Sequence, residues 1–280
     1  MCFCISVALR LYDPIRRRVL RRSLIVVGDW GRMGRSDKAL RAIPGWFYPS
    51  DIALFRFALT ESGVQVGRGD LAEVGTYLGK SAVLIGEYLH PGEVFTVIDL
   101  FGDVSGALAN DTENAQQYPA LTEQRFRENY KKAHDHLPVI VKGPSEILPD
   151  HAAADAHRFI HIDGSHLYEH VATDVMTAQK LLAPQGIAVF DDYRSVHTPG
   201  VAAAVWQAVE HGMHVIAVSP MKMYATWGDP RPWRKSLTSW LPGSGLDYEE
   251  QSVLGEALFR VSPKPSVLLR ALVAYQKRRK

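Results

Sequence analysis

Short apolar and β-branched runs alternate with longer segments of helical periodicity from residue 71 onward. The first apolar run, 71–75, is followed by a helical pattern at 81–89 and, after the turn Pro91-Gly92, by a second apolar run at 94–99. Strand, helix and strand in this order form a βαβ unit, whose two strands are parallel. The pattern therefore predicts an α/β protein with a doubly wound, mostly parallel sheet and helices on both faces.

The same alternation continues toward the C-terminus. The unbroken apolar run 187–190 is typical of a buried central strand, and Pro199 is placed to begin a helix. The remaining elements follow from the same periodicities. The predicted strands are 138–141, 158–163, 187–190, 214–218 and an edge strand at 257–261, and the predicted helices are 121–133, 167–182 and 199–210.

Two segments lack a clear period and are predicted to be irregular. Residues 100–120 are rich in Gly, Asn, Asp and Gln, and such a long loop after a strand is a candidate substrate lid. Residues 219–247 are rich in Pro, Gly and Trp and are predicted to form an irregular segment outside the sheet. We divide the chain into an N-terminal basic helical extension (1–45), a main α/β domain (46–262) and a C-terminal helix (263–280).

Composition and charge narrow the class of ligand. The 280 residues include 32 basic and 30 acidic side chains, so the chain lacks the strong positive field of a dedicated nucleic-acid binder. We expect a small-molecule substrate and no nucleic-acid partner. No apolar stretch approaches the roughly 20 residues that span a bilayer, and no signal peptide is recognisable. With only Cys2 and Cys4, the sequence favours a cytoplasmic protein.

The first 22 residues carry six arginines interleaved with apolar residues. This amphipathic basic segment is either a solvated helix or a surface for an anionic membrane or a partner. Together with the Trp-rich stretch, it is also a surface through which a homo-oligomer could form.

The run 71–81, Leu-Ala-Glu-Val-Gly-Thr-Tyr-Leu-Gly-Lys-Ser, is a strand that leads through a glycine turn into a helix. A phosphate-binding P-loop needs four residues between its first glycine and Gly-Lys-Ser, and only three intervene here. The Gly-x-Gly-x-x-Gly spacing of a dinucleotide site is also absent. Neither of the two common phosphate-binding turns is therefore present.

An acidic residue at the end of this strand suits a cationic ligand, and S-adenosylmethionine carries an ammonium and a sulfonium but no phosphate. Asp99 ends the next strand, where a carboxylate can accept hydrogen bonds from ribose hydroxyls; its alternative role is that of a turn residue. A turn at 142–145 is placed to lie beside adenine. The candidate donor-binding residues are Glu73, Gly75, Thr76, Tyr77, Gly79, Ser81, Asp99, Ser145 and Asp163.

Three aspartates stand at the ends of two later strands: Asp163 ends the strand 158–163, and Asp191 and Asp192 follow the strand 187–190. The carboxyl ends of neighbouring parallel strands meet at one edge of the sheet, so these side chains are expected to converge. Converging carboxylates repel one another unless a cation is present, and Mg²⁺ prefers oxygen ligands. The three are candidate metal ligands, with turn or helix capping as the alternative for Asp191 or Asp192.

His166 lies three residues after Asp163 and is a candidate general base for a substrate hydroxyl, with packing at a helix N-terminus as the equal alternative. We predict catalytic roles for His166 and Asp163. His161, two residues before Asp163 on the strand, is interpreted as a buried core residue. Aromatic residues at 46–49 are candidates for a substrate wall.

Three motifs, Glu-Val-Gly-Thr-Tyr-Leu-Gly-Lys-Ser, Ile-Asp-Gly-Ser-His-Leu-Tyr-Glu and Phe-Asp-Asp-Tyr, resemble those of the macrocin-type O-methyltransferases. The resemblance spans about residues 45–220. It implies a class I methyltransferase fold, S-adenosylmethionine as donor and, as in the sugar-modifying members, a divalent metal at Asp163, Asp191 and Asp192. Members of this type can have an aspartate base shortly after the first metal ligand, where this chain has Ser165 and His166.

The predicted reaction is therefore metal-assisted transfer of a methyl group from S-adenosylmethionine to a hydroxyl of a sugar or another small natural product. Two alternatives stay open. A nucleotide or nucleotide-sugar oxidoreductase uses the same kind of sheet and the same ribose carboxylate. A methyltransferase-like scaffold would bind a partner and perform no chemistry.

Overall fold

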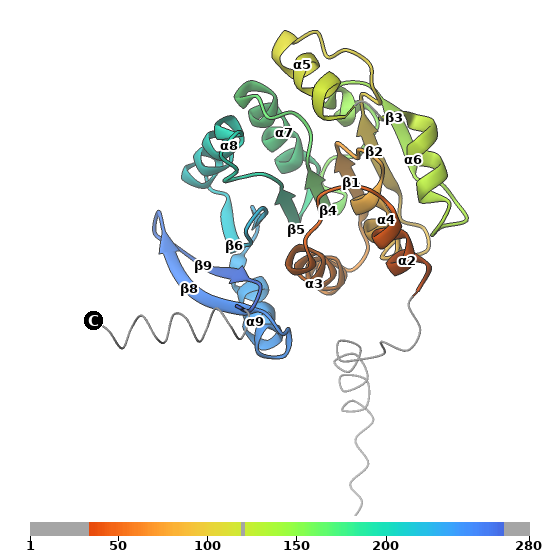
Figure 1. Ribbon diagram of the computed structural model, residues 1–280. Coiled ribbons are helices and arrows are strands. Elements are labelled where there is room, and N and C mark those ends of the chain that lie inside the picture. The colour runs from red at the N-terminus through yellow and green to blue at the C-terminus, as the bar shows by residue number, and fades with distance from the viewer. Residues whose placement is uncertain (1–33, 119–120, 266–280) are drawn as a thin grey trace, which may run out of the picture. The chain divides into compact units, whose positions relative to one another are not determined.

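The computed structural model describes residues 34–118 and 121–265. Within these ranges the strands form one sheet in the order β3-β2-β1-β4-β5-β7-β6-β9-β8 (Figure 1). The strands are β1 Asp70–Val74, β2 Phe95–Asp99, β3 Val139–Lys142, β4 His157–Ile162, β5 Leu182–Phe190, β6 His214–Val218, β7 Met223–Thr226, β8 Asp247–Val253 and β9 Glu256–Ser262.

Helices connect most of these strands and cover the sheet. Pro49 and Pro199 each occupy the first turn of their helix, where the missing N–H costs no hydrogen bond. The helices are α2 Arg35–Ala42, α3 Pro49–Gln65, α4 Lys80–Gly86, α5 Leu108–Gln117, α6 Glu123–Tyr130, α7 Tyr168–Leu181, α8 Pro199–Glu210 and α9 Pro230–Trp240, with the short 3₁₀ segments η1 Ser145–Asp150 and η2 Leu241–Gly243.

The sheet is mostly parallel, as predicted. Strands β3, β2, β1, β4 and β5 pair in parallel, β7 is inserted antiparallel between β5 and β6, and β9 is parallel to β6. From β1 the chain first builds outward through β2 to β3 and then returns to place β4 on the other side of β1. The strand order reverses between β1 and β4, and in open α/β sheets ligands bind at such a point.

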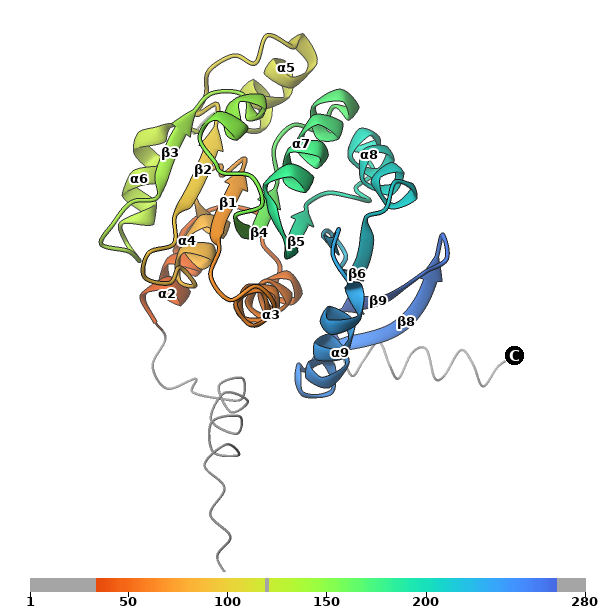
Figure 2. The same cartoon turned by 180° about the vertical axis from the view of Figure 1, so that it is seen from behind.

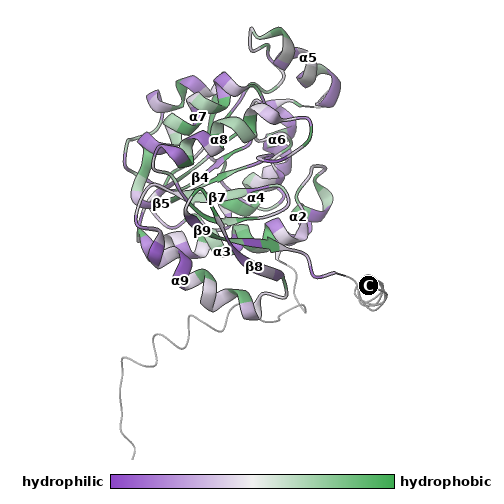
Figure 3. Ribbon diagram, turned by 90° about the vertical axis from the view of Figure 1, so that its left-hand side faces the viewer, coloured by the Kyte–Doolittle hydropathy of each residue, from purple (hydrophilic) through white to green (hydrophobic). Residues whose placement is uncertain are grey.

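Alternate residues of the central strands face two separate cores. On β1, Leu71 packs with α3 and α4, whereas Ala72 and Val74 pack with α7. Seen from behind, β3 and the β8–β9 hairpin lie at opposite ends of the sheet (Figure 2). Coloured by hydropathy, the strands are largely green at the centre, and purple appears on α9 and β8 at the outside (Figure 3).

Most predicted elements are confirmed to within a few residues, but three expectations are corrected. The segment 100–120 is not all loop, because its polar residues form α5, where Asp111 accepts hydrogen bonds from the N–H and hydroxyl of Ser105. The stretch 219–247 contains β7 and α9, whose Trp233 is fully buried. The predicted edge strand, β9, is covered by β8, whose solvent-exposed residues gave no alternating pattern.

The basic segment before residue 34 and most of the predicted C-terminal helix lie outside the described residues. Residues 35–45, which we assigned to the N-terminal extension, pack into the main core through Ala39, Leu40 and Ile43. The packed domain therefore begins N-terminal to the expected boundary at residue 46. Within the described ranges, no helix combines the length and apolar character needed to cross a bilayer.

A buried arginine near the start of the central strand β4 connects the sheet to the helices. Arg158 of β4 is fully buried and forms an ion pair of 2.9 Å with the equally buried Glu93, between α4 and β2. Its guanidinium also donates to Ser62 at 2.7 Å and to the carbonyls of Leu59 and Tyr88 at 3.1 and 2.6 Å. The side chain therefore joins β4 to α3 and to the loop before β2.

We expect Arg158→Met to lower the free energy of unfolding by about 3–5 kcal/mol, because the buried carboxylate of Glu93 loses its arginine and keeps only His90 and the Gly69 N–H as partners. The control is Arg35→Met, which breaks the exposed pair with Asp135 and is expected to cost at most about 1 kcal/mol. Urea unfolding followed by circular dichroism measures both values. Equal losses in the two variants would contradict this role for Arg158.

Candidate active site

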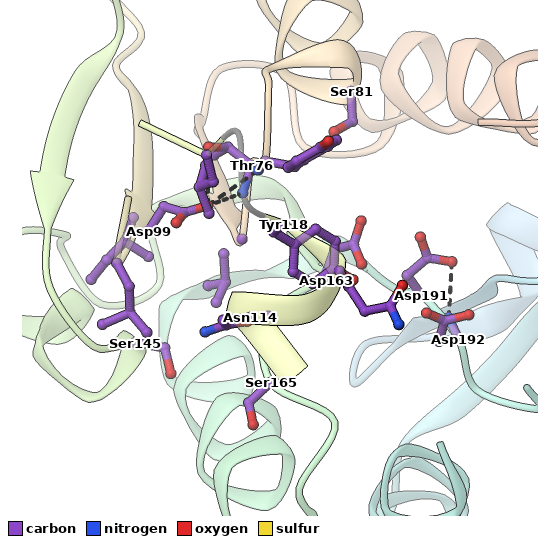
Figure 4. A pocket seen from close by; sticks show the side chains of 18 of the residues that line it. Thr76, Ser81, Asp99, Asn114, Tyr118, Ser145, Asp163, Ser165, Asp191 and Asp192 are labelled. Atoms are coloured by element: carbon purple, nitrogen blue, oxygen red, sulfur yellow. Dashed lines mark hydrogen bonds between the residues drawn. The ribbon is translucent and has the colours of Figure 1, made fainter. Parts of the chain in front are cut away.

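A cavity of about 620 Å³ lies at the carboxyl ends of β1, β2, β4 and β5 (Figure 4). This is the edge at which the strand order reverses, and the volume is typical of a small-molecule site. Part of the wall comes from α5, within the segment that we predicted to be a lid. The predicted residues on its wall are Gly75, Thr76, Tyr77, Ser81, Asp99, Ser145, Asp163, Asp191 and Asp192.

The glycine turn after β1 is shaped by close backbone packing. A Cβ atom on Gly75, whose φ is 74°, would lie 1.9 Å from the carbonyl oxygen of Asp163 at the end of β4. Gly79 has a left-handed backbone at the N-terminus of α4 and lies against the ring of Phe126. Gly75 faces the cavity, whereas Gly79 shapes the turn from outside its wall.

Asp99 faces the cavity and also holds the glycine turn. Its Oδ2 accepts hydrogen bonds from the backbone N–H of Thr76 at 2.7 Å and of Tyr77 at 3.2 Å, and Oδ1 accepts from Phe101 N–H at 2.8 Å. Burial raises the pKa of Asp99, and these donors offset part of that rise. The contact with Phe101 fits the turn role that we kept open for Asp99, whereas its contacts with the glycine turn were not predicted.

Glu73 does not reach the cavity. Its side chain is fully buried on the α3 side of the sheet, and Oε1 lies 2.8 Å from Nδ1 of His161. Burial raises the pKa of Glu73 to about 8, although the nearby Ser81 hydroxyl and Lys222 ammonium act in the opposite direction. We therefore correct the prediction that Glu73 contacts the donor: strand alternation points it into the protein, where it is a partner of His161.

An acidic centre forms where β4 and β5 end. Ligand atoms of Asp163, Asp191 and His161 all lie within 4.8 Å of one another. The ammonium of Lys222, from the loop between β6 and β7, forms an ion pair with Asp191 and lies 3.2 Å from Nε2 of His161. The centre thus contains a cation supplied by the chain itself.

Asp192 lines the same cavity, and its charge acts on Asp163, but it is not among the ligand atoms that lie within 4.8 Å of one another. Its backbone has a left-handed φ of 53°, and its carboxylate accepts from the Ser195 hydroxyl and lies 3.4 Å from Nε2 of His166. The turn role that we kept open for Asp191 or Asp192 therefore fits Asp192. The third residue whose ligand atoms lie close to Asp163 and Asp191 is His161.

The residues present do not fit the predicted metal site. A divalent cation between Asp163 and Asp191 would lie beside the ammonium of Lys222, with which it would compete for the same oxygen atoms. Burial opposes the charge of Lys222, but Asp191 and Asp163 outweigh burial and raise its pKa above the ordinary value. The lysine therefore stays charged, and it supplies the neutralisation for which the sequence argument invoked Mg²⁺.

His166 is not on the cavity wall, although Asp163, Ser165 and His170 are. Its ring lies beside Asp192 and makes an edge contact with His197, with ring centroids 5.8 Å apart. Burial and the neighbouring charge of Asp191 raise the pKa of Asp163 well above its ordinary value. Of the two predicted catalytic residues, Asp163 is therefore the one that reaches the cavity.

Two features of the wall escaped the sequence prediction. Lys222 lies next to a short buried strand, and the only signal was a lone cation within the apolar run Pro-Met-Lys-Met-Tyr. The second is an aromatic group in which Trp46 stacks on Tyr77 at 5.9 Å and Tyr118 makes edge contacts with both at 6.1 and 5.2 Å. Trp46 was expected in a substrate wall; its partners were not.

We expect Glu73→Gln to become more stable relative to the native protein as pH rises from about 5 to about 8. The folded pKa of about 8 exceeds the unfolded value of 4.5, so folding takes up a proton in this range and native stability falls as pH rises. The difference should grow by at most about 1.4 kcal/mol per pH unit. Urea unfolding at three pH values measures it, with the exposed Glu169→Gln as control. Parallel pH profiles of Glu73→Gln and the native protein would contradict the shift.

Residues 72–193 match a sequence family described as a methyltransferase domain. Three solved structures are similar. The O-methyltransferase NovP is 18% identical over 64% of this chain and 80% of its own, with a TM-score of 0.50. An O-methyltransferase from Bacillus cereus is 14% identical over 75% of this chain and 96% of its own (TM-score 0.50), and Rv0187 from MTB is 16% identical over 79% of this chain and 100% of its own (TM-score 0.51). No curated protein matches the sequence. At these identities the structures establish the fold. The segment 72–193 is thus similar to a methyltransferase domain, and the described residues share the fold of these solved structures.

Proposed function

We propose that the chain transfers a methyl group from S-adenosylmethionine to a hydroxyl group of a small molecule. The observation that carries the proposal is a single cavity that joins the glycine turn and Asp99 at one end to the acidic centre at the other. A donor and an acceptor bound in one cavity can be held in line, which removes most of the orientational entropy of the reaction.

The donor half of the cavity suits an adenosyl group. Oδ2 of Asp99 already accepts from the N–H and hydroxyl of Thr76 and from the N–H of Tyr77, whereas Oδ1 accepts only from Phe101 and can accept one further hydrogen bond, from a ribose hydroxyl. Ser145 and Gly143 lie beyond β3, where the adenine ring would be placed. A relative of the same fold, the Bacillus cereus enzyme, was solved in complex with SAH, which supports the same class of ligand here.

The acceptor half suits a hydroxyl compound that must lose a proton. As the acceptor oxygen attacks the methyl carbon, the carbon–sulfur bond breaks, its electron pair returns to sulfur, and the hydroxyl proton passes to a base. We assign that base to Asp163, because this residue lines the cavity and because burial raises its pKa, which makes its carboxylate a stronger proton acceptor. Trp46, Tyr118 and His197 on the wall would contact the body of a sugar or another natural product.

Isothermal titration with S-adenosylmethionine and its demethylated product tests the donor site. We expect micromolar binding by the native protein and at least a tenfold loss in Asp99→Ala, on the order of one or two hydrogen bonds to a charged group. Asp103→Ala is the matched control, because this carboxylate lies on the same loop but pairs with Lys142. Tight NADH binding without donor binding would favour the oxidoreductase alternative instead.

The base assignment is tested by comparing Asp163→Asn with His166→Asn. Loss of a general base typically lowers the rate about 10²–10⁴-fold, which we expect for Asp163→Asn, whereas His166→Asn should stay within about tenfold of the native rate. The measurement is formation of the demethylated product with an acceptor found by screening hydroxyl compounds. The reverse order of effects would assign the base to His166. Inertness toward all acceptors despite donor binding would favour a scaffold.

A further inference from the structure

We propose that Lys222 takes the place of a divalent cation in this active site, so that the acidic centre binds no metal and methyl transfer is metal-independent. The structural part of this proposal is that Lys222, and no metal ion, neutralises Asp163 and Asp191. The catalytic part of the proposal is that the lysine assists methyl transfer, and it rests on the proposed function.

Asp191 and two aromatic rings hold the side chain of Lys222 in position. Its side chain is only 2% exposed, yet it forms part of the cavity wall. The ammonium lies 5.5 Å from the ring centroid of Phe47 and 5.4 Å from that of Phe55, within the range of cation–π attraction. Because the aromatic faces and Asp191 attract the same group, the ammonium is a built part of the site.

The hydrogen bonds around His161 leave it unable to bind a metal. An ammonium can only donate, so Nε2 of His161 accepts from Lys222. The remaining proton of the neutral ring is then on Nδ1, which donates to Glu73 at 2.8 Å. Both ring nitrogens are therefore used, and Glu73 is the residue that fixes the tautomer.

Asp191 is likewise committed to the lysine. It accepts directly from the ammonium, and a ligand atom of Asp163 lies within 4.8 Å of its carboxylate. A second cation placed among these atoms would be repelled by the lysine and would find only part of the predicted ligand set, because Asp192 is held by Ser195 and lies beside His166.

During methyl transfer the ammonium would act as a fixed positive charge and hydrogen-bond donor. It lies on the cavity wall beside the carboxylate that we assign as base, so it can stabilise negative charge on an acceptor oxygen as the proton leaves. Because this charge is already in place and desolvated, the site needs no metal recruitment before the reaction.

Manganese binding, measured by electron paramagnetic resonance in the absence of donor and acceptor, tests the structural part. The native protein is expected to bind no Mn²⁺ at this centre. Lys222→Met removes the charge at similar size and should bind one Mn²⁺, with a dissociation constant at least about tenfold below the highest Mn²⁺ concentration at which the native protein shows no binding. The double variant Lys222→Met/Asp191→Asn should lose that binding. Lys80→Met is the matched control, because this lysine of the same cavity bonds the Gly45 carbonyl.

Two outcomes would overturn the proposal: an Mn²⁺ site in the native protein that Asp191→Asn abolishes, or a folded Lys222→Met that gains no Mn²⁺ binding. If Lys222→Met does not fold, native protein with and without Asp191→Asn still decides the first point, and Lys222→Arg, which keeps the charge, should remain free of Mn²⁺. EDTA should leave turnover unchanged. Since Mn²⁺ binding is read without donor, failure of the proposed function would appear separately, in the donor titration.

Discussion

The ion pair between Lys222 and Asp191 makes the arrangement of the active-site edge possible. Two strands end in carboxylates that lie within 4.8 Å of each other, and without a positive charge their repulsion would oppose the packing of β4 beside β5. The lysine comes from the loop before β7, the strand that pairs antiparallel with β5. The antiparallel insertion is thus both part of the sheet and the source of the charge that the site requires.

From the same ammonium, a line of hydrogen bonds runs back into the protein through His161 to Glu73 on β1. Glu73 and Asp99 both belong to the donor-side motif, but the structure separates their positions. Asp99 is at the end of its strand and faces the cavity, while Glu73, two residues before Gly75, is fully buried and bonds His161. The motif therefore combines one residue that faces the ligand space with one that organises the interior.

The sequence predicted those parts of the fold whose burial leaves a periodic pattern. The strand, glycine turn and helix from 70 to 86 and the buried strand before Asp191 were predicted because both faces of these strands are covered. β8 was missed because its residues are mostly exposed, and α5 because its polar residues have no apolar face to the core. Lys222 was missed because the identity of a charge partner depends on strand pairing, which spacing along the chain does not record.

Gly75 in the turn after β1 is required by the packing of the backbone, independently of the ligand. The close approach of the Asp163 carbonyl leaves no room for a side chain, whatever molecule occupies the cavity. Substitution at this position would push apart the ends of β1 and β4 before any ligand bound, so the packing of the two strands by itself requires a glycine here. Its presence is therefore evidence about the geometry of the sheet, and the identity of the ligand has to be argued from the neighbouring side chains.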